Sequence, residues 1–160
     1  GLLHCWLHST SKIHTISGPH YKSGKKWSYP ANRNASKRND LVYRCFDSEN
    51  QNMLVQKTLN FNSTVIINNI CEGQSGNIYL LGYKLNDAFN TQPLVACITD
   101  GGKLLWEQKL NNFLYGSYFS ASEDNNGHVY IIGTTNSFGV GSYGNDIIVN
   151  KCNQKNGRFE

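Results

Sequence analysis

Residues that could bind a metal ion gather at the start of the chain, where His4, Cys5, His8, His14 and His20 fall within twenty positions. His4 and His8 have the i, i+4 spacing with which one helix presents two imidazoles to a zinc ion. No glutamate follows His4, however, and the remaining ligands would have to come from an irregular segment. The pattern favours an incidental histidine-rich end, and we expect neither a metal site nor a cofactor.

Oxygen ligands of the kind that calcium prefers occur at Asp124, Asn125 and Asn126, directly before Gly127. A calcium loop would also need an acid at the position of Ser122 and a bidentate glutamate downstream, and neither is present. We therefore interpret this segment as a turn between two strands.

Acids that could act as a catalytic pair recur at Glu72 and Glu123, an offset of 51 positions. Glycoside hydrolysis uses two carboxylates, so this recurrence raises the hypothesis of an enzyme. A catalytic acid is needed once, whereas an acid that caps a turn is needed in every repeat. We therefore expect a structural role for both residues and predict no catalytic residue.

Residues 99–106 resemble the Asp-box of sialidase-type propellers, but Trp106 lies one position too far along the chain. We interpret this segment as a hairpin turn followed by an aromatic packing residue. No Gly-x-Ser-x-Gly, Walker-type or Cys-x-x-Cys motif occurs in the sequence.

The elements that carry these residues repeat. Ser-Gly-Asn-Ile-Tyr-Leu-Leu-Gly at 75–82 returns as Asn-Gly-His-Val-Tyr-Ile-Ile-Gly at 126–133. Identities also include Leu59/Leu110, Asn60/Asn111, Glu72/Glu123, Gly76/Gly127, Tyr79/Tyr130 and Gly82/Gly133. A fixed period in this range is typical of an array of supersecondary units.

A second signal is that Cys45, Cys97 and Cys152 each follow an apolar run. Their spacing predicts equivalent positions in successive units, which would hold the three thiols apart. Counting back 21 positions from Cys45 predicts that a divergent first copy begins at Gly24. In the third copy, the same spacing predicts four inserted residues within 136–144.

Each unit alternates apolar and polar residues as short strands do, for example at 65–70, 78–83, 94–98 and 104–109. Four antiparallel strands in about fifty residues are the content of one β-propeller blade. We therefore predict an all-β fold of propeller-type repeats, with about three four-stranded blades in an incomplete ring. The predicted domains are an irregular basic leader (1–20) and one repeat domain (21–160), with blade segments of about 21–59, 60–110 and 111–160.

The segment 127–139, with Asn145 to Val149 and Asn156-Gly157, resembles the Gly/Asp-rich bacterial repeat called the SBBP (seven-bladed β-propeller) repeat. The copy at 76–83 with 99–106 is similar to blades of quinoprotein-like propellers. The resemblance covers roughly residues 40–160. It implies scaffold and binding proteins that are secreted or lie at the cell surface, and it implies no shared catalytic residues.

The charge is uneven: residues 1–40 carry seven Lys and Arg against Asp40 alone, a net +6, whereas the remaining 120 residues carry eight against ten. No recognised nucleic-acid motif accompanies the basic segment, so we expect no nucleic-acid binding. No apolar stretch approaches the length of a membrane-spanning helix. Buried free thiols favour a reducing compartment, whereas the resemblance implies an extracellular or cell-surface protein.

The function that the sequence favours is a non-catalytic binding or structural scaffold, with a protein or a carbohydrate as ligand. The residues expected to contact that ligand are Asn136, Phe138, Tyr143 and Asn145, in and beside the inserted loop. The alternatives are part of a propeller enzyme, hydrolase or quinoprotein-like, and a carbohydrate-binding propeller assembled from several chains. Because closed propellers have four to eight blades, the missing blades are expected from a longer chain or from a homo-oligomer.

Overall fold

The computed structural model describes residues 3–5, 12–17, 40–47, 49, 51–85, 90–111, 115–136 and 145–160, and no helix occurs among them. Its strands are β1 (Leu3–Cys5), β2 (Lys12–Ser17), β3 (Asp40–Asp47), β4 (Met53–Asn60), β5 (Val65–Glu72), β6 (Ile78–Leu85), β7 (Thr91–Ile98), β8 (Leu104–Lys109), β9 (Gly116–Glu123), β10 (His128–Thr135) and β11 (Asp146–Asn153). The prediction of an all-β fold is confirmed.

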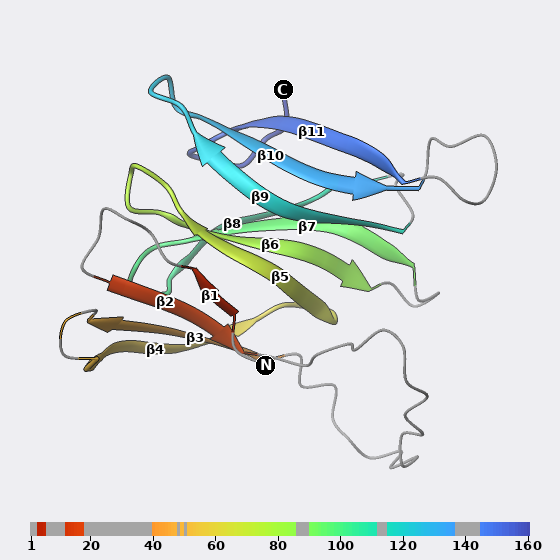
Figure 1. Cartoon of the computed structure of the whole chain (residues 1–160). Helices are drawn as coiled ribbons and strands as arrows, with labels where there is room; N and C mark the ends of the chain where they lie inside the picture. The colour runs from red at the N-terminus through yellow and green to blue at the C-terminus, as the bar shows by residue number, and fades with distance from the viewer. Residues whose placement is uncertain are drawn as a thin grey trace, which may run out of the picture.

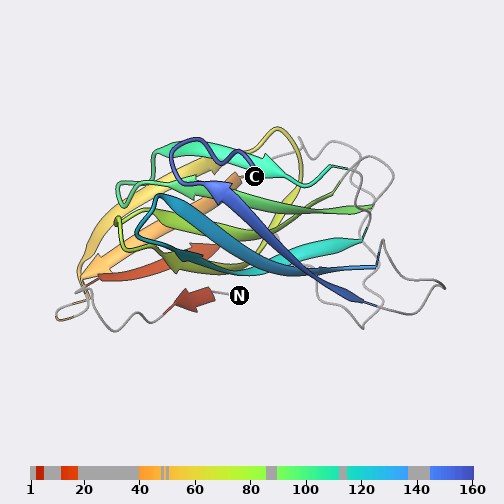
Figure 2. The same cartoon turned by 90° about the horizontal axis from the view of Figure 1, so that it is seen from above.

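The strands form three antiparallel sheets that follow one another along the chain and are stacked, with the second between the other two (Figure 1). The first sheet contains β1 to β4, the second β5 to β8 and the third β9 to β11, each in sequence order. Seen from above, the strands of successive sheets overlap and fan out (Figure 2). The three sheets of the described residues form no closed ring.

The second and third sheets repeat the same strand register. Tyr79 pairs with Cys71, and Tyr130 pairs with Ser122, so each tyrosine lies eight positions after its partner. Both are in the second strand of their sheet, as the 51-residue offset predicts. The expected equivalence of Tyr79 and Tyr130 is confirmed.

The same β-bulge also recurs, opposite Gly82 in the second sheet and opposite Gly133 in the third. A Cβ at Gly82 would lie 1.9 Å from the Ile66 carbonyl oxygen, and one at Gly133 would lie 2.2 Å from that of Ser117. Only glycine allows the strands to approach this closely, which explains why both repeats carry glycine here.

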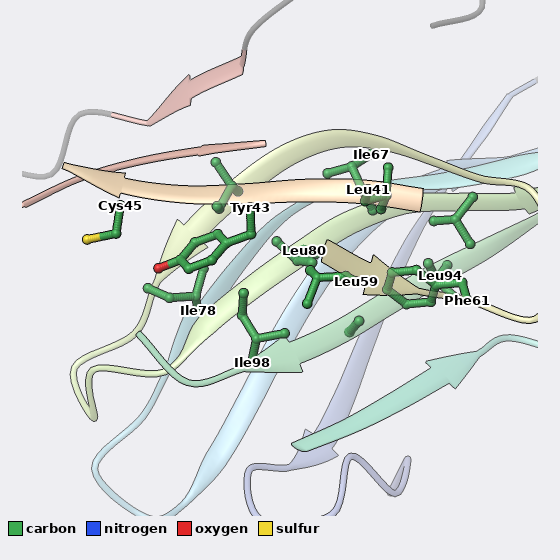
Figure 3. Close-up of a cluster of buried hydrophobic side chains, with 13 residues drawn as sticks. Leu41, Tyr43, Cys45, Leu59, Phe61, Ile67, Ile78, Leu80, Leu94 and Ile98 are labelled. Carbon is green, nitrogen blue, oxygen red and sulfur yellow. The ribbon is translucent and has the colours of Figure 1, made fainter. Parts of the chain in front are cut away.

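Two apolar cores lie between the sheets. The core between the first and second sheets includes Leu41, Tyr43, Ile78, Leu80 and Ile98 (Figure 3). The core between the second and third sheets includes Tyr79, Leu81, Val95, Cys97, Trp106, Tyr118, Val129, Ile131, Ile148 and Cys152. Because the second sheet is covered on both faces, β6 and β7 contain nearly continuous apolar runs.

The first sheet begins earlier than the sequence predicted. β1 and β2 lie within residues 1–20, for which we expected an irregular leader. His14 pairs with Cys45 as Tyr79 pairs with Cys97, so β2 is the equivalent of β6. The counterpart of Gly76 therefore precedes β2, and the assignment of Gly24 to that position is wrong, because the spacing argument assumed no insertion between β2 and β3. Gly24 itself lies outside the described residues.

The equivalence predicted for Cys152 is also wrong, by one residue. Leu81 pairs with Val95, which lies 14 positions later in the chain. Its equivalent Ile132 pairs with Val149, which lies 17 positions later, so three residues are inserted rather than four. Cys152 pairs with Val129 and therefore corresponds to Ile98. A slip of one residue turns a side chain to the other face of a strand. Cys97 and Cys152 thus share one core instead of being held apart.

Candidate functional site

Glu123, at the end of β9 on the face turned toward the second sheet, is an acid with several hydrogen-bond partners. Its carboxylate accepts hydrogen bonds from the Ser75 backbone N–H at 2.8 Å and the Ser75 hydroxyl at 2.6 Å. It also accepts one from the Tyr79 hydroxyl at 2.5 Å and one from Gln154 Nε2 at 3.0 Å. Glu123 therefore connects the second sheet, through Ser75 and Tyr79, with the turn at Gln154 that follows the third sheet.

Burial of the Glu123 carboxylate opposes its ionisation, but the hydrogen bonds outweigh burial and lower its pKa below the ordinary value. A Cβ at Gly73 would lie 2.2 Å from Glu123 Cδ, so glycine gives the carboxylate the room to approach the turn before β6. An ionised carboxylate that accepts four hydrogen bonds is suited to holding sheets together rather than to exchanging protons with a substrate.

Glu72 does not form a pair with Glu123. It lies two positions after Ile70, which belongs to the core between the first and second sheets, so it is on the face of β5 turned toward the first sheet. Burial raises the pKa of Tyr43 in that sheet most, Cys45 and Asp100 raise it further, and the charge of Glu72 adds a smaller contribution. The two recurring acids thus face different sheets, and the structural role expected for both is shown for Glu123 by its hydrogen bonds.

Residues 124–127 form a tight turn. Asp124 Oδ1 accepts hydrogen bonds from the backbone N–H groups of Asn126 at 2.8 Å and His128 at 2.9 Å. These bonds, the one from His128 first, lower the pKa of Asp124 to about 2. Gly127 supplies the positive φ of 83° that the turn requires. The interpretation of this segment as a turn is confirmed, and no cluster suited to a metal ion occurs within the described ranges.

The segment 99–106 is a hairpin turn followed by a packing residue, as predicted. The Thr99 hydroxyl accepts a hydrogen bond from the Lys103 N–H at 3.1 Å. Trp106 is buried against Tyr79, with ring centroids 6.0 Å apart, and its indole N–H donates to the Gln154 carbonyl at 2.8 Å. Trp106 therefore contributes to the contact between the second and third sheets.

Two of the four predicted ligand-contact residues, Asn136 and Asn145, lie at one end of the third sheet. Asn136 and Asn145 are exposed and stand where β10 ends and just before β11 begins. Phe138 and Tyr143 lie outside the described residues. Next to Asn145, Asp146 has a buried carboxylate oxygen without a hydrogen-bond partner in the part of the chain that the structure describes. This end of the sheet therefore presents the exposed polar side chains of Asn136 and Asn145.

The N-terminal histidines do not have the geometry that the zinc hypothesis required. His4 and Cys5 belong to strand β1, so His4 and His8 cannot share one helix face. His8 and His20 lie outside the described residues.

Sequence reasoning missed an exposed apolar surface among the described residues. The face of the third sheet that points away from the second sheet carries Phe119, Tyr130, Ile132, Ile147 and Val149, all exposed. We call this set the outer face of the third sheet. The signal that could have revealed it is the repeat itself, because the positions equivalent to Tyr130, Ile132 and Val149 are core positions in the second sheet.

Comparison with protein-family models gives no match, and comparison with the curated proteins gives none either. No helix in the described part of the chain has the length and apolar character needed to span a membrane.

Proposed function

We propose that the protein is a non-catalytic scaffold of the β-propeller type, in which each sheet is a blade and recognition is carried by the loops at the blade ends. The matching register of the second and third sheets and the resemblance to Gly/Asp-rich propeller repeats support this proposal. Its ligand is a protein or a carbohydrate bound beside Asn136 and Asn145.

The observation that carries the proposal is that the turn glycine of each later sheet packs on an aromatic side chain and on one equivalent strand position of the sheet before it. Gly102 of the second sheet packs on Tyr43 and Lys57 of the first. Gly157, after β11, packs in the same way on Trp106 and Gln108 of the second sheet. Lys57 and Gln108 are equivalent in the strand pairing of their sheets. A stack that repeats its interface in this way can add blades without changing its design.

An aromatic donor also reaches the same turn across each interface, although Tyr43 lies in the third strand of its sheet and Trp106 in the fourth. The Tyr43 hydroxyl donates to the Asp100 carbonyl at 2.9 Å, and the Trp106 indole N–H donates to the Gln154 carbonyl at 2.8 Å. In each case an aromatic side chain of one sheet caps the outer turn of the next. These contacts supply rigidity, which a binding surface formed by loops needs from the sheets that present it.

The recurring acids distinguish the scaffold from the rival function, a propeller hydrolase. A panel of chromogenic esters, glycosides and phosphate esters should be tested with the wild-type chain and with Glu72→Gln and Glu123→Gln. If the protein is a scaffold, neither the wild-type chain nor either variant turns over any of these substrates above the uncatalysed rate. Turnover by the wild type that is lost in either variant would identify an enzyme and overturn the proposal.

A titration of the ¹⁵N-labelled chain with a panel of oligosaccharides tests the recognition part. Binding at the loop end shifts the backbone amide signals of Asn136 and Asn145, and the variant Asn136→Ala/Asn145→Ala weakens it. Shifts confined to the outer face of the third sheet would contradict this placement.

A further inference from the structure

We infer that the outer face of the third sheet is a docking surface for one further antiparallel sheet of the same repeat. The inference rests on the proposed function, since it names the partner that the propeller-type stack accepts next. It is carried by a correspondence at three positions between this exposed face and a face that is already covered.

The exposed positions are equivalent to core positions one sheet earlier. Tyr130 is 41% exposed and Tyr79 is 1% exposed, although they occupy the same place in their strands. Ile132 and Val149 pair with each other as Leu81 and Val95 do in the second sheet.

The difference in exposure between these pairs is large. Ile132 and Val149 are 47% and 63% exposed, whereas Leu81 and Val95 are fully buried under the third sheet. At Tyr130, Ile132 and Val149 the third sheet therefore presents outward the apolar side chains with which the second sheet receives its neighbour. Next to Tyr130 the charged Lys151 stands where the second sheet has Cys97. An exposed contiguous apolar patch of this kind marks an interaction site.

The covered face also defines the chemistry of the partner. Above the second sheet, β9 places Tyr118 in the core and Glu123 on the Tyr79 hydroxyl. By the same geometry, the first strand of the docking sheet carries a large apolar residue at the position of Tyr118. It also carries a carboxylate at the position of Glu123, which accepts a hydrogen bond from the Tyr130 hydroxyl.

The stack shows how such a sheet can be supplied. Cys152 pairs with Phe159 as Ile98 pairs with Leu104, so Phe159 occupies the first position of a fourth strand in the third sheet. Adding a second copy of residues 106–160 after Glu160 therefore continues this strand in register. The added segment also supplies a new sheet with its own copy of Glu123.

The test compares the reactivity of one introduced thiol in the 160-residue chain and in this extended chain. Val149→Cys, in the original copy only, places the thiol on the outer face, and Val95→Cys places it at the equivalent covered position. Alkylation is followed by site-resolved mass spectrometry at low protein concentration. We expect Cys at 149 to react at least ten times more slowly in the extended chain, approaching the rate of Cys at 95.

Leu54→Cys, on the exposed strand β4 of the first sheet, is the matched control and should react equally in both chains. Equal reactivity of Cys at 149 in the two chains, with Cys at 95 protected in both, would overturn the docking inference and leave the stack intact. Fast reaction of Cys at 95 in the 160-residue chain would show that the sheets do not stack, and the proposed scaffold would fail.

Two further measurements distinguish an added sheet from a second copy of the chain as the occupant of the outer face. Changing the added copy of Glu123 to Gln should partly restore the reactivity of Cys at 149, as expected if its carboxylate binds Tyr130. Protection of Cys at 149 that grows with the concentration of the 160-residue chain would identify a second copy as the occupant and overturn the inference.

Discussion

The hydroxyl of Tyr79 and the carboxylate of Glu123 form a 2.5 Å hydrogen bond across the interface between the second and third sheets. Tyr130 is the equivalent of Tyr79 one repeat later, yet it lies on an exposed face. Tyr79 thus stabilises an interface between two sheets, whereas its equivalent Tyr130 is exposed on the outer face of the third sheet.

The contrast predicts different effects for one substitution at two equivalent positions. Tyr79→Phe removes a hydrogen bond to a charged group and should lower the free energy of unfolding by about 1.5–3 kcal/mol. Tyr130→Phe should change it by less than about 0.5 kcal/mol, as is usual at an exposed site. Urea denaturation of both variants measures the difference, and equal effects would contradict the assigned interface.

Glu123 predicts a dependence of stability on pH. Its pKa is lower in the folded chain than the ordinary 4.5, so its contribution is present above that pH. The contribution is lost as the pH falls below about 4.5 toward the folded pKa. The stability advantage of the wild type over Glu123→Gln should therefore shrink between about pH 5 and about pH 3 in thermal unfolding. A gap that stays constant over this range would contradict the role given to the carboxylate.

The glycine of the bulge predicts a steric effect. Gly133→Ala places a Cβ 2.2 Å from the Ser117 carbonyl oxygen and should destabilise the chain by about 3 kcal/mol, the upper part of the range for overpacking. Gly101→Ala is the matched control, because its Cβ meets no atom closer than 3.7 Å. Denaturant midpoints measure both variants, and a Gly133→Ala chain as stable as the control would show that the bulge is absent.

The thiols of the second core predict slow chemical modification. Burial raises the pKa of Cys97 to about 12 and that of Cys152 to about 11, and it raises that of the half-buried Cys71 as well. At about pH 8 the thiolate fraction of Cys97 and Cys152 is then on the order of one in a thousand or less. Site-resolved alkylation of the native chain should modify Cys71 first, and denaturant should remove the difference. Fast modification of Cys97 in the native chain would contradict its burial.

Much of the fold could be predicted from the sequence where the repeat runs without a gap. The offset of 51 residues placed Tyr79 and Tyr130 in equivalent strands, because the alternation of a strand and the glycine of a bulge leave direct traces in the residues. The prediction failed where insertions intervene. Cys152 was assigned to the wrong face because one residue more or less between β10 and β11 reverses every side chain that follows.

The candidate site could be predicted only in part, for a different reason. The structural role of Glu123 follows from the recurrence of the acid, but its Ser75, Tyr79 and Gln154 partners come from three separate turns and strands that only the stack brings together. The outer face of the third sheet carries the same residue types as a buried face. Its exposure depends on which sheet lies next to it, and no single segment of the sequence records that.

The measurement that tests the account most directly is a nuclear Overhauser spectrum of the labelled chain at the two sheet interfaces. A Cβ at Gly157 would lie 2.4 Å from Trp106 Cε3, and one at Gly102 would lie 3.0 Å from Tyr43 Cδ1. The α-hydrogens of both glycines therefore touch these rings. We expect one cross-peak between Gly157 and Trp106 and another between Gly102 and Tyr43. The absence of either cross-peak from the spectrum of the folded chain would contradict a stack of sheets that repeats its interface.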